Sequence, residues 1–372
     1  MIDLFMPFRS IFKLNNVSTD NNVFRMHYML TVTILLVFTL LVSTKQFFGE
    51  PMHCVSESDK DHDKEAMNSY CWIYGTYTLK SRLVGKIGKD MAYVGVGPDK
   101  SLDAEQIKHT YYQWVCFVFL AQAAMFYTPH YLWKIWEGGR LKALASELAN
   151  PLISKDWSDG KRSELVTYLT YTNLYTHNMY ALRYAFCELL NLVNVVGQIF
   201  LLDQFLGGAF RDYGAAVTAF THVPKVPKDF LDFDAVNPMD KYFPKLTKCW
   251  FRSYGPSGTL QLKDRLCILP LNIVNEKIFV FLWFWLVFLA FLSTLAVLYR
   301  ILIISMPPLR TLMIMGQLRF VKRRIISKIV YRISFGDWFI LHLLGKNMNP
   351  LLYKELIIEV SKELEKRPNN MI

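Results

Sequence analysis

Four long apolar stretches constrain this chain more than any other feature of its sequence. They cover residues 28–48, 110–133, 183–206 and 277–305. Each has the roughly 20 mostly apolar residues that a helix needs to cross the hydrocarbon core of a bilayer. A hydrophobic content of 52% and an aromatic content of 15% agree with this pattern, since a soluble domain of this size is usually less apolar. We therefore expect four transmembrane helices, with both chain ends on one side of the membrane.

A cleaved signal peptide is the alternative interpretation of the first stretch. Residues 1–27 precede that stretch and include the charged side chains of Asp3, Lys13 and Arg25. No small-residue cleavage site follows the apolar run, as a signal peptide requires. We therefore interpret this stretch as a span that stays in the protein.

The charge distribution predicts which side of the membrane each segment occupies. From Arg300 onward the sequence holds 13 Lys and Arg against 5 Asp and Glu, in a chain with a net charge of +11. Because Lys and Arg concentrate in the cytoplasmic segments of membrane proteins, we expect the tail, 306–372, and the N-terminal segment, 1–27, in the cytoplasm. The remaining segments are then one cytoplasmic loop, 134–182, and two extracellular loops, which we call the first loop, 49–109, and the second loop, 207–276.

Four of the six cysteines lie in the two extracellular loops. Cys54 and Cys71 belong to the first loop, and Cys249 and Cys267 belong to the second. Even numbers of cysteines in such loops suit disulfides in an oxidising exterior. A zinc site is the alternative, but neither pair has the short Cys-x-x-Cys spacing or a ligand-spaced histidine. We therefore predict disulfides and no metal, while the spacing leaves open which cysteines pair.

The N-terminal segment is apolar ahead of the first span. Thr19 and Asp20 are good caps for a helix that runs on into the membrane. From the residues alone, the segment either folds back into a pore or lies on the bilayer surface, and surface attachment is slightly favoured. The residues at its start are Ile2, Asp3, Leu4 and Phe5.

Polar residues within two of the spans are candidates for function. An ionisable group in hydrocarbon is costly, so a polar helix face points into protein or toward water. Two interpretations stay open for the third span: Glu188 lines a permeation path, or, as we favour, the polar face forms hydrogen bonds that hold subunits together. In the second span, Pro129 removes a backbone donor and is expected to kink the helix. The residues that share one face of the third span are Glu188, Asn191, Asn194 and Gln198.

The rest of the sequence gives little support for catalysis. It has no phosphate loop, no His-Glu-x-x-His and no Gly-x-Ser-x-Gly, so we expect neither an enzyme nor a cofactor. The acidic run 59–65 starts like a calcium loop, but Lys64 and Tyr70 replace the required Gly and Glu. The basic amphipathic stretch 319–332 suits either anionic lipid headgroups or a solvated domain surface. Nucleic-acid binding is a poor interpretation for a chain with four spans.

The motif Tyr111-Tyr112-Gln113-Trp114-Val115, at the start of the second span, resembles a signature of the innexins, the invertebrate gap-junction proteins. Segments 45–49, 71–75 and 134–142 are similar to the insect germline members of that family. Further innexin-like motifs extend over nearly the whole chain: Gly49-Glu50-Pro51, Tyr70-Cys71-Trp72-Ile73, Tyr127-Thr128-Pro129, Trp136-Glu137-Gly138-Gly139, Cys267-Ile268-Leu269-Pro270-Leu271-Asn272 and Phe335-Gly336-Asp337-Trp338-Phe339.

This resemblance implies a particular fold. The expected protein is an all-α membrane protein: a four-transmembrane-helix bundle with two disulfide-braced extracellular loops and a helical cytoplasmic dome. The resemblance also implies cross-loop disulfides, Cys54 with Cys267 and Cys71 with Cys249. It places the segment from Ile2 to Phe5 in the pore, which overrides the preference of the bare sequence for the bilayer surface.

The same resemblance implies a function at the plasma membrane. Innexin subunits form a homo-oligomeric ring of roughly eight, surrounded by membrane lipids. The ring docks at a gap junction to a second ring of the same or other innexins, and passes ions and small metabolites between cells. Two alternatives are a non-docking large-pore hemichannel of the pannexin kind and a four-span adhesion protein. The only glycosylation signal, Asn16-Val17-Ser18, lies on the expected cytoplasmic side, which favours loops free to dock.

Overall fold

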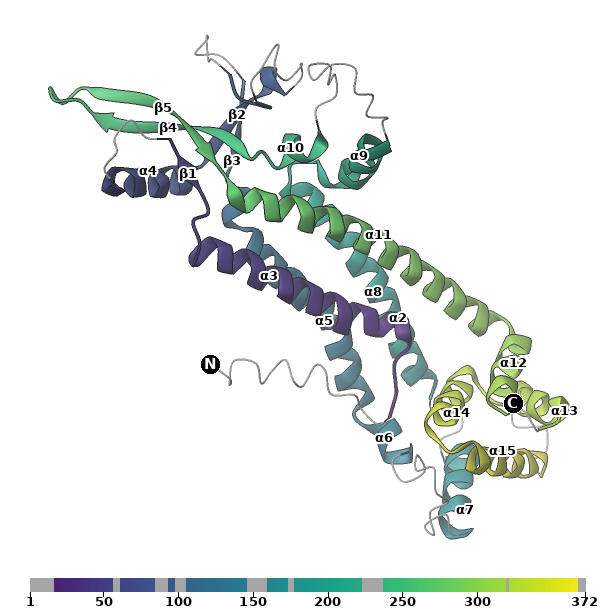
Figure 1. The fold of residues 1–372 in the computed structure, drawn as a ribbon. Coiled ribbons are helices and arrows are strands. Elements are labelled where there is room, and N and C mark those ends of the chain that lie inside the picture. The colour runs from purple at the N-terminus through teal and green to yellow at the C-terminus, as the bar shows by residue number, and fades with distance from the viewer. Residues whose placement is uncertain are drawn as a thin grey trace. The chain divides into compact units, whose positions relative to one another are not determined.

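The computed structural model describes residues 17–55, 61–83, 93–97, 105–145, 159–172, 177–222, 237–318 and 321–366. The predicted pore residues Ile2, Asp3, Leu4 and Phe5 lie outside these ranges. The described chain is mainly helical and contains one five-stranded sheet (Figure 1). It forms two compact units. Unit 1 comprises the described parts of Met1–Val32, Met125–Asn194 and Leu289–Ile372, and unit 2 those of Thr33–Ala124 and Val195–Phe288.

Four helices among the described residues are long and apolar enough to cross a membrane, which confirms the predicted number. The second, third and fourth are α5 (Val115–Glu137), α8 (Asn178–Phe205) and α11 (Pro270–Ser305). The first combines three segments without a break: α2 (Asn22–Arg25), the π-helix η2 (Met26–Thr31) and α3 (Val32–Phe47).

The first span begins at a different cap from the one that the sequence predicts. The Asn21 side chain accepts a hydrogen bond of 2.6 Å from the backbone N–H of Phe24 and thereby satisfies a free donor of the first turn. The expectation that Thr19 or Asp20 caps this helix is wrong. The Thr19 hydroxyl instead donates to the Asp20 carboxylate at 2.7 Å, and Asp20 also accepts from the Tyr28 hydroxyl at 3.1 Å.

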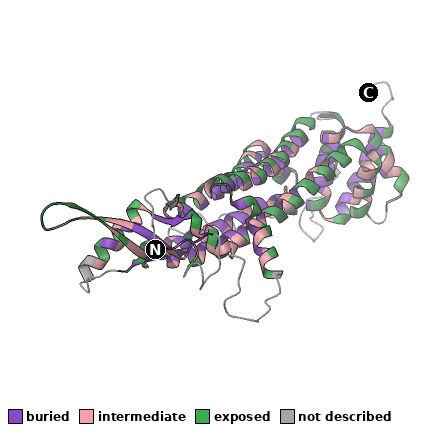
Figure 2. Ribbon diagram, turned by 90° about the horizontal axis from the view of Figure 1, so that it is seen from above, coloured by how far each residue is buried: buried purple, intermediate pink, exposed green. Residues whose placement is uncertain are grey.

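The long helices expose apolar side chains along one side. Figure 2 shows that the long helices have both exposed and buried residues along their length. On α11 the exposed set recurs at helical spacing, whereas Leu282, Leu286 and Leu289 on another side are buried. Such a stripe suits lipid or a neighbouring subunit rather than water. The exposed residues are Phe281, Phe284, Phe288, Phe291, Leu295 and Leu298.

Unit 2 contains an antiparallel sheet that the sequence analysis did not predict. Its strand order is β1-β5-β4-β2-β3, so β1 pairs with β5 and β2 pairs with β4. Three of these strands come from the first loop and two from the second, and the sheet therefore joins the two loops. The strands are β1 (His53–Cys54), β2 (Thr76–Leu79), β3 (Gln106–His109), β4 (Leu246–Tyr254) and β5 (Leu260–Ile268).

Besides the membrane spans, the described part of unit 2 contains several short helical elements. At α9, a side chain on Gly214 would clash with the Trp283 ring, so only glycine allows this approach to α11. Trp283 also donates from its indole nitrogen to the Arg211 carbonyl at 2.9 Å, which fixes α9 on α11. The helical elements are α4 (Asp61–Tyr74), η3 (Lys80–Arg82), η4 (Tyr111–Gln113), α9 (Phe210–His222) and α10 (Pro238–Tyr242).

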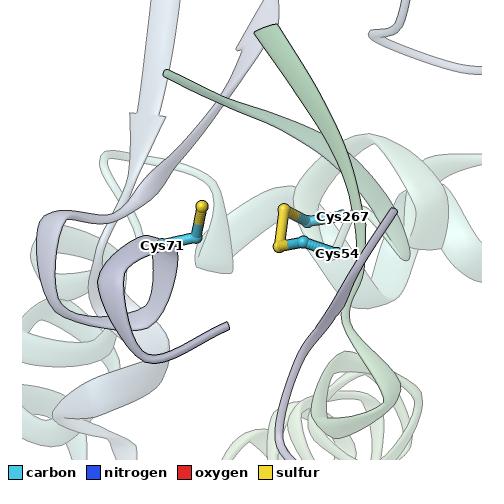
Figure 3. A group of neighbouring side chains, drawn as sticks. All are labelled: Cys54, Cys71 and Cys267. Atoms are coloured by element: carbon cyan, nitrogen blue, oxygen red, sulfur yellow. A yellow bond between two sulfur atoms is a disulfide. The ribbon is translucent and has the colours of Figure 1, made fainter. Parts of the chain in front are cut away.

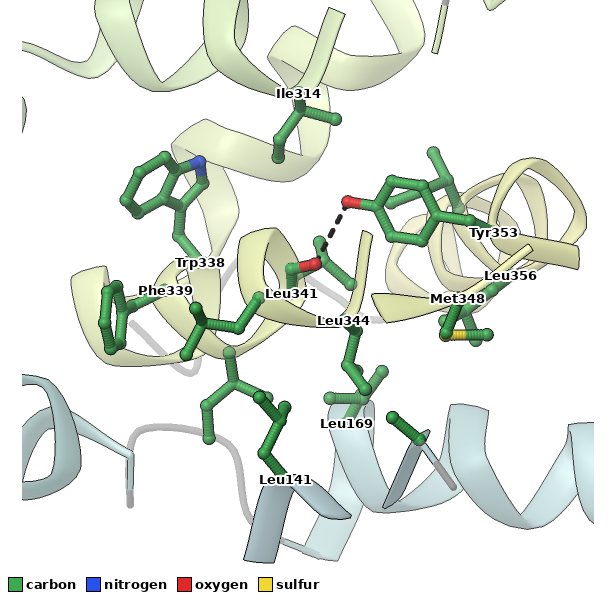
Figure 4. Packing of buried hydrophobic residues seen from close by; sticks show 14 of the residues in the cluster. Leu141, Leu169, Ile314, Trp338, Phe339, Leu341, Leu344, Met348, Tyr353 and Leu356 are labelled. Atoms are coloured by element: carbon green, nitrogen blue, oxygen red, sulfur yellow. Dashed lines mark hydrogen bonds between the residues drawn. The ribbon is translucent and has the colours of Figure 1, made fainter. Parts of the chain in front are cut away.

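Unit 1 contains a helical domain built around α14. This helix is buried on all sides, as expected of a helix without a polar face. Figure 4 shows Leu341 and Leu344 of α14 packed among side chains of the neighbouring helices, with the Tyr353 hydroxyl donating to the Leu341 carbonyl at 3.1 Å. The helices of this domain are α6 (Arg140–Ala145), α7 (Asp159–Thr167), η5 (Tyr168–Thr172), α12 (Pro307–Gln317), α13 (Arg323–Arg332), α14 (Phe335–Asn347) and α15 (Pro350–Glu365).

Two of the family-like motifs have local structural roles in unit 1. Gly336 of α14 has no room for a side chain, because a Cβ atom there would clash with the His177 backbone. The Glu137 carboxylate accepts from the backbone N–H groups of Gly139 and Leu141, at 2.7 and 2.8 Å, and so caps the start of α6. Gly138 and Gly139 both have positive φ, which ends α5 and starts this turn.

Candidate functional site

Two disulfides join the two loops in unit 2. Cys54 of β1 lies opposite Cys267 of β5 in the sheet, and their Cα atoms are 4.0 Å apart. Cys71 of α4 is bonded to Cys249 of β4, with Cα atoms 5.9 Å apart. These are the pairs that the family resemblance implies. Each bond fastens an element of the first loop to a strand of the second.

The two disulfides lie side by side. Figure 3 shows the Cys71 sulfur facing the bond between Cys54 and Cys267. The sulfurs of these three cysteines lie within 4.8 Å of one another, close enough for a metal ion. A metal ligand must be a thiolate, however, and sulfurs that are oxidised to disulfides cannot supply one. The site is therefore a covalent brace.

The family motif explains how α4 is held beside the second span. The side-chain amide of Gln113 donates to the backbone carbonyl of Trp72, and to that of Ile73 at 3.4 Å. These carbonyls belong to the last turn of α4, and carbonyl groups of a last turn have no hydrogen-bond partner within the helix. Gly75, with φ of 85°, then ends α4 in the left-handed conformation common at helix ends. Gln113 is thus the C-terminal cap of α4.

The aromatic residues of the motif fill the space beneath this cap. The rings of Tyr112 and Trp72 have centroids 4.7 Å apart, and Tyr112 is fully buried. The ring of Tyr111 packs edge to face on Phe243 at 5.7 Å. Both rings therefore act as packing groups.

The other two motif residues differ in burial. Val115 is fully buried at the start of α5, whereas Trp114 is 59% exposed. An exposed Trp next to a membrane helix is typical of the water interface of a bilayer. This position fits the start of a span.

The end of the β4–β5 hairpin is apolar and exposed. Between the strands, Gly255 donates to the Thr259 carbonyl at 2.8 Å, and Gly258, with φ of 78°, closes the turn. Beside the turn, Tyr254 is 79% exposed, and Leu260 and Leu262 are also exposed. Large apolar groups gathered on an exposed strand end mark an interaction surface. We call this surface, Tyr254 to Leu262, the hairpin tip.

The polar face of the third span supports a buried ion pair in unit 1. Both carboxylate oxygens of Glu188 accept from the guanidinium of Arg300, at 2.6 and 2.8 Å. The Asn21 side-chain amide donates to the same carboxylate at 2.7 Å. The Arg300 guanidinium also lies over the rings of Tyr184 and Phe339, about 5 Å from each centroid. Asn21, α8, α11 and α14 therefore meet at this pair.

A second polar contact lies beside the pair. The His27 ring, in η2, makes a hydrogen bond of 2.7 Å with the Ser293 hydroxyl of α11. Among the described residues, the His27 Nδ1 atom and the Asn191 side chain have no hydrogen-bond partner. They border a small hollow of about 10 Å³. A space of this size, with polar groups on several sides, accommodates one water molecule.

The structure places the predicted polar residues on the inner side of α8. Glu188, Asn191 and Gln198 are buried, and Asn194 is partly buried. The Glu188 carboxylate bonds to Arg300 and Asn21 of its own chain, so its contacts lie within a subunit and not between subunits. The two predicted roles of the polar face, in permeation and in subunit contact, stay predictions. Pro129 lies within α5, which continues through it.

Sequence reasoning missed Arg300, Asn21 and His27. Arg300 contributes to the positive charge counted for the tail, but the structure places it inside α11, where Glu188 neutralises it. A basic residue five residues before the end of an apolar span, with an acid in another span, is the signal that could have revealed the pair.

Comparison with known proteins gives a consistent result. The family model described as Innexin matches residues 20–364. Innexin inx2 of Drosophila melanogaster is 45% identical over 364 residues, which cover 98% of this chain and 96% of that protein. Innexin inx2 of Schistocerca americana is 46% identical over 365 residues, 98% and 99% of the two chains. Innexin shaking-B of Drosophila melanogaster is 42% identical over 364 residues, 98% and 95%.

Proposed function

This chain belongs to the innexin family of gap-junction channel subunits, and we propose that it forms a ring that docks to a second ring on the neighbouring cell. The observation that carries the docking proposal is the exposed, apolar hairpin tip on a sheet built from both loops. In a single subunit this tip exposes large side chains to water, which is unfavourable. Contact with an opposing ring would bury them.

Rigidity of the loops supports the same proposal. Docking of two preformed rings costs least when the contacting surfaces are already ordered. The loops meet this requirement because β1·β5 and β2·β4 pairing and both disulfides connect them. Buried Lys248 adds a further cross-link, since it donates to the Gly97 carbonyl at 3.0 Å and pairs with Asp264.

The orientation follows from the chemistry of each side. In our proposal the disulfide-bonded loops face the oxidising exterior, and the basic tail, 306–372, lies in the cytoplasm with the N-terminal segment. The protein then acts at the plasma membrane, in gap junctions.

The pore proposal concerns the first residues of the chain. We place Ile2, Asp3, Leu4 and Phe5 at the narrowest part of a ring of roughly eight subunits, as the family resemblance implies. The described start of the chain is anchored in unit 1. The backbone N–H of Ser18 donates to the Asn347 side chain at 2.6 Å, and the Asn347 amide donates back to the Ser18 carbonyl at 2.9 Å. A fixed anchor at Ser18 would give every subunit of a ring the same starting point for its N-terminal segment.

Electrical recording from paired cells that express only this chain tests the proposal. Docked channels give a junctional current between the two cells. Current across a single membrane without junctional current would favour the non-docking hemichannel, and absence of both currents in surface-expressing cells would favour an adhesion protein. We propose conduction, and no catalysis, as the activity of the chain.

A further inference from the structure

We propose that a groove between α13 and α15 binds the phosphate-bearing headgroup of an anionic membrane lipid. The groove has a volume of about 380 Å³ and lies in the helical domain of unit 1. This binding site is separate from the loops and from the buried ion pair, so it goes beyond the channel function proposed above.

Three basic residues of α13 line the groove. Arg324, Lys328 and Arg332 are spaced four residues apart, which places them on one side of the helix. Hydroxyl groups of Ser327 and Tyr331 lie between them in the same lining, and both can donate hydrogen bonds. Arginine forks and lysine ammonium groups combined with hydroxyl donors are the chemistry that binds phosphate.

The positive charge of the groove is only partly neutralised by the protein. Lys328 pairs with Glu365 at 2.8 Å, and Arg332 donates to the Leu364 carbonyl. Among the described residues, Arg324 has no such partner. The Lys328–Glu365 pair is exposed on both sides and therefore weak, so a phosphate with two negative charges can compete with Glu365 for Lys328.

The start of α13 adds to the positive potential. Lys322 and Arg323 are exposed beside Arg324, and the first turn of the helix contains no acidic residue. Basic side chains at the N-terminus of a helix face the positive end of its dipole, which is unfavourable without an anion. Binding of an anion in the groove would relieve this repulsion.

The position of α13 in unit 1 favours a lipid as the source of the anion. α12 begins two residues after the membrane helix α11 ends at Ser305, and α12 packs against α13 (Figure 1). Arg310 of α12 donates to the carbonyl of Ile303, in the last turn of α11, at 2.8 Å. Tyr331, 63% exposed in the groove lining, has the amphipathic ring that is common at the membrane interface.

Binding of a multiply charged lipid to the full-length protein tests the proposal. The protein is reconstituted in phosphatidylcholine nanodiscs, and binding of phosphatidylinositol bisphosphate in the same bilayer is measured by fluorescence. The groove variant is Arg324→Gln/Lys328→Gln. The matched control is Lys354→Gln/Lys362→Gln, which removes the same charge from α15 outside the groove lining. Because each basic group near a lipid surface contributes roughly fivefold, we expect about tenfold or more weaker binding in the groove variant and less than twofold change in the control.

Three results would overturn the inference. They are absence of lipid binding by the unmodified protein, an equal loss in the groove variant and the control, and binding of free inositol trisphosphate without binding of the lipid. The single variant Arg324→Gln is expected to fold normally, since this side chain has no protein partner among the described residues. Unchanged lipid binding in this variant would also contradict the proposed groove.

Discussion

Glu188 and Arg300 are 112 residues apart in the sequence, yet they form a two-point ion pair in which both carboxylate oxygens accept from one guanidinium. Both side chains are largely buried, at 5% and 12% exposed. Removal of one member leaves the other as an unpaired charge in an apolar setting. The loss of a single partner should therefore be more harmful than the loss of both.

The first prediction concerns this pair. Arg300→Met should destabilise the protein by about 3–5 kcal/mol, whereas Arg300→Met/Glu188→Met should recover much of that loss. Thermal unfolding in detergent, followed by size-exclusion chromatography, measures both. Arg252→Met is the control, because Arg252 is exposed on β4. Equal destabilisation by Arg300→Met and Arg252→Met would show that the pair contributes nothing to stability.

The second prediction concerns the covalent brace. Replacement of Cys71 and Cys249 together by Ser should lower stability by about 2–5 kcal/mol and abolish junctional current, because the loops would lose their connection through α4. Peptide mapping without reduction should recover Cys54 joined to Cys267. Recovery of Cys54 joined to Cys71 would contradict the pairing.

The third prediction places a glycan on the hairpin tip. Ser257→Asn creates an Asn-Gly-Thr glycosylation signal together with Gly258 and Thr259, at an exposed turn where an Asn-Gly pair is well tolerated. We expect junctional current to disappear while single-membrane current persists, because a bulky hydrated glycan cannot fit between closely apposed rings. A glycosidase-sensitive gel shift confirms modification.

The control for this glycan is Ser257→Asn/Thr259→Ala, which keeps the asparagine and removes the glycosylation signal. This variant should conduct between cells normally. Full glycosylation with normal junctional current would place the hairpin tip outside the docking surface.

The fourth prediction concerns the pore. In the single variants Ile2→Cys, Asp3→Cys and Leu4→Cys, a charged thiol reagent should change the current within seconds of application to open channels. The unmodified protein is a suitable control, because its free cysteines, Cys116 and Cys187, are buried. Currents that stay constant in all three variants would place the N-terminal segment outside the pore.

The fifth prediction is a dependence of loop stability on pH. Burial lowers the pKa of His109 in β3 from 6.5 to about 4, and its ring forms a hydrogen bond of 2.8 Å with Thr78. Between these pH values the unfolded state binds more protons than the folded state. The contribution of neutral His109 to the free energy of unfolding is therefore fully present above pH 6.5. It decreases as the pH falls toward 4, by up to about 3 kcal/mol.

Melting curves over this range measure the effect of His109. The variant His109→Gln keeps a hydrogen-bonding side chain and removes the titration, so its stability should vary less with pH. The same pH dependence in both proteins would mean that other groups cause it.

The membrane helices could be predicted from sequence because the bilayer imposes a strict length and hydropathy on each span. The sheet could not. β1 has only two residues, and all four residues of β2 are buried, so neither shows the alternating pattern that identifies a strand. The partner of β1, which is β5, and one of the two partners of β2, which is β4, lie in the other loop, where no local signal indicates them.

The sequence predicted some residues of the candidate site but not the contacts between them. The Tyr111–Val115 motif identified the family, but its sequence did not indicate that Gln113 caps a helix of the first loop. Glu188 was recognised as an acid within a span. The roles of Asn21 and Arg300 as its partners can be recognised only from the packing of three helices. Long-range pairing of this kind has no periodicity along the chain.

The sheet shared by the two loops also sets the order of events during synthesis. The partner of Cys54 is made 213 residues later, which at translation rates of about 5–20 residues per second is a delay of roughly 10–40 s. Two more membrane spans must be synthesised before those partner strands, so the sheet stays incomplete throughout that interval. The first loop therefore cannot complete its native structure before the second loop has been made.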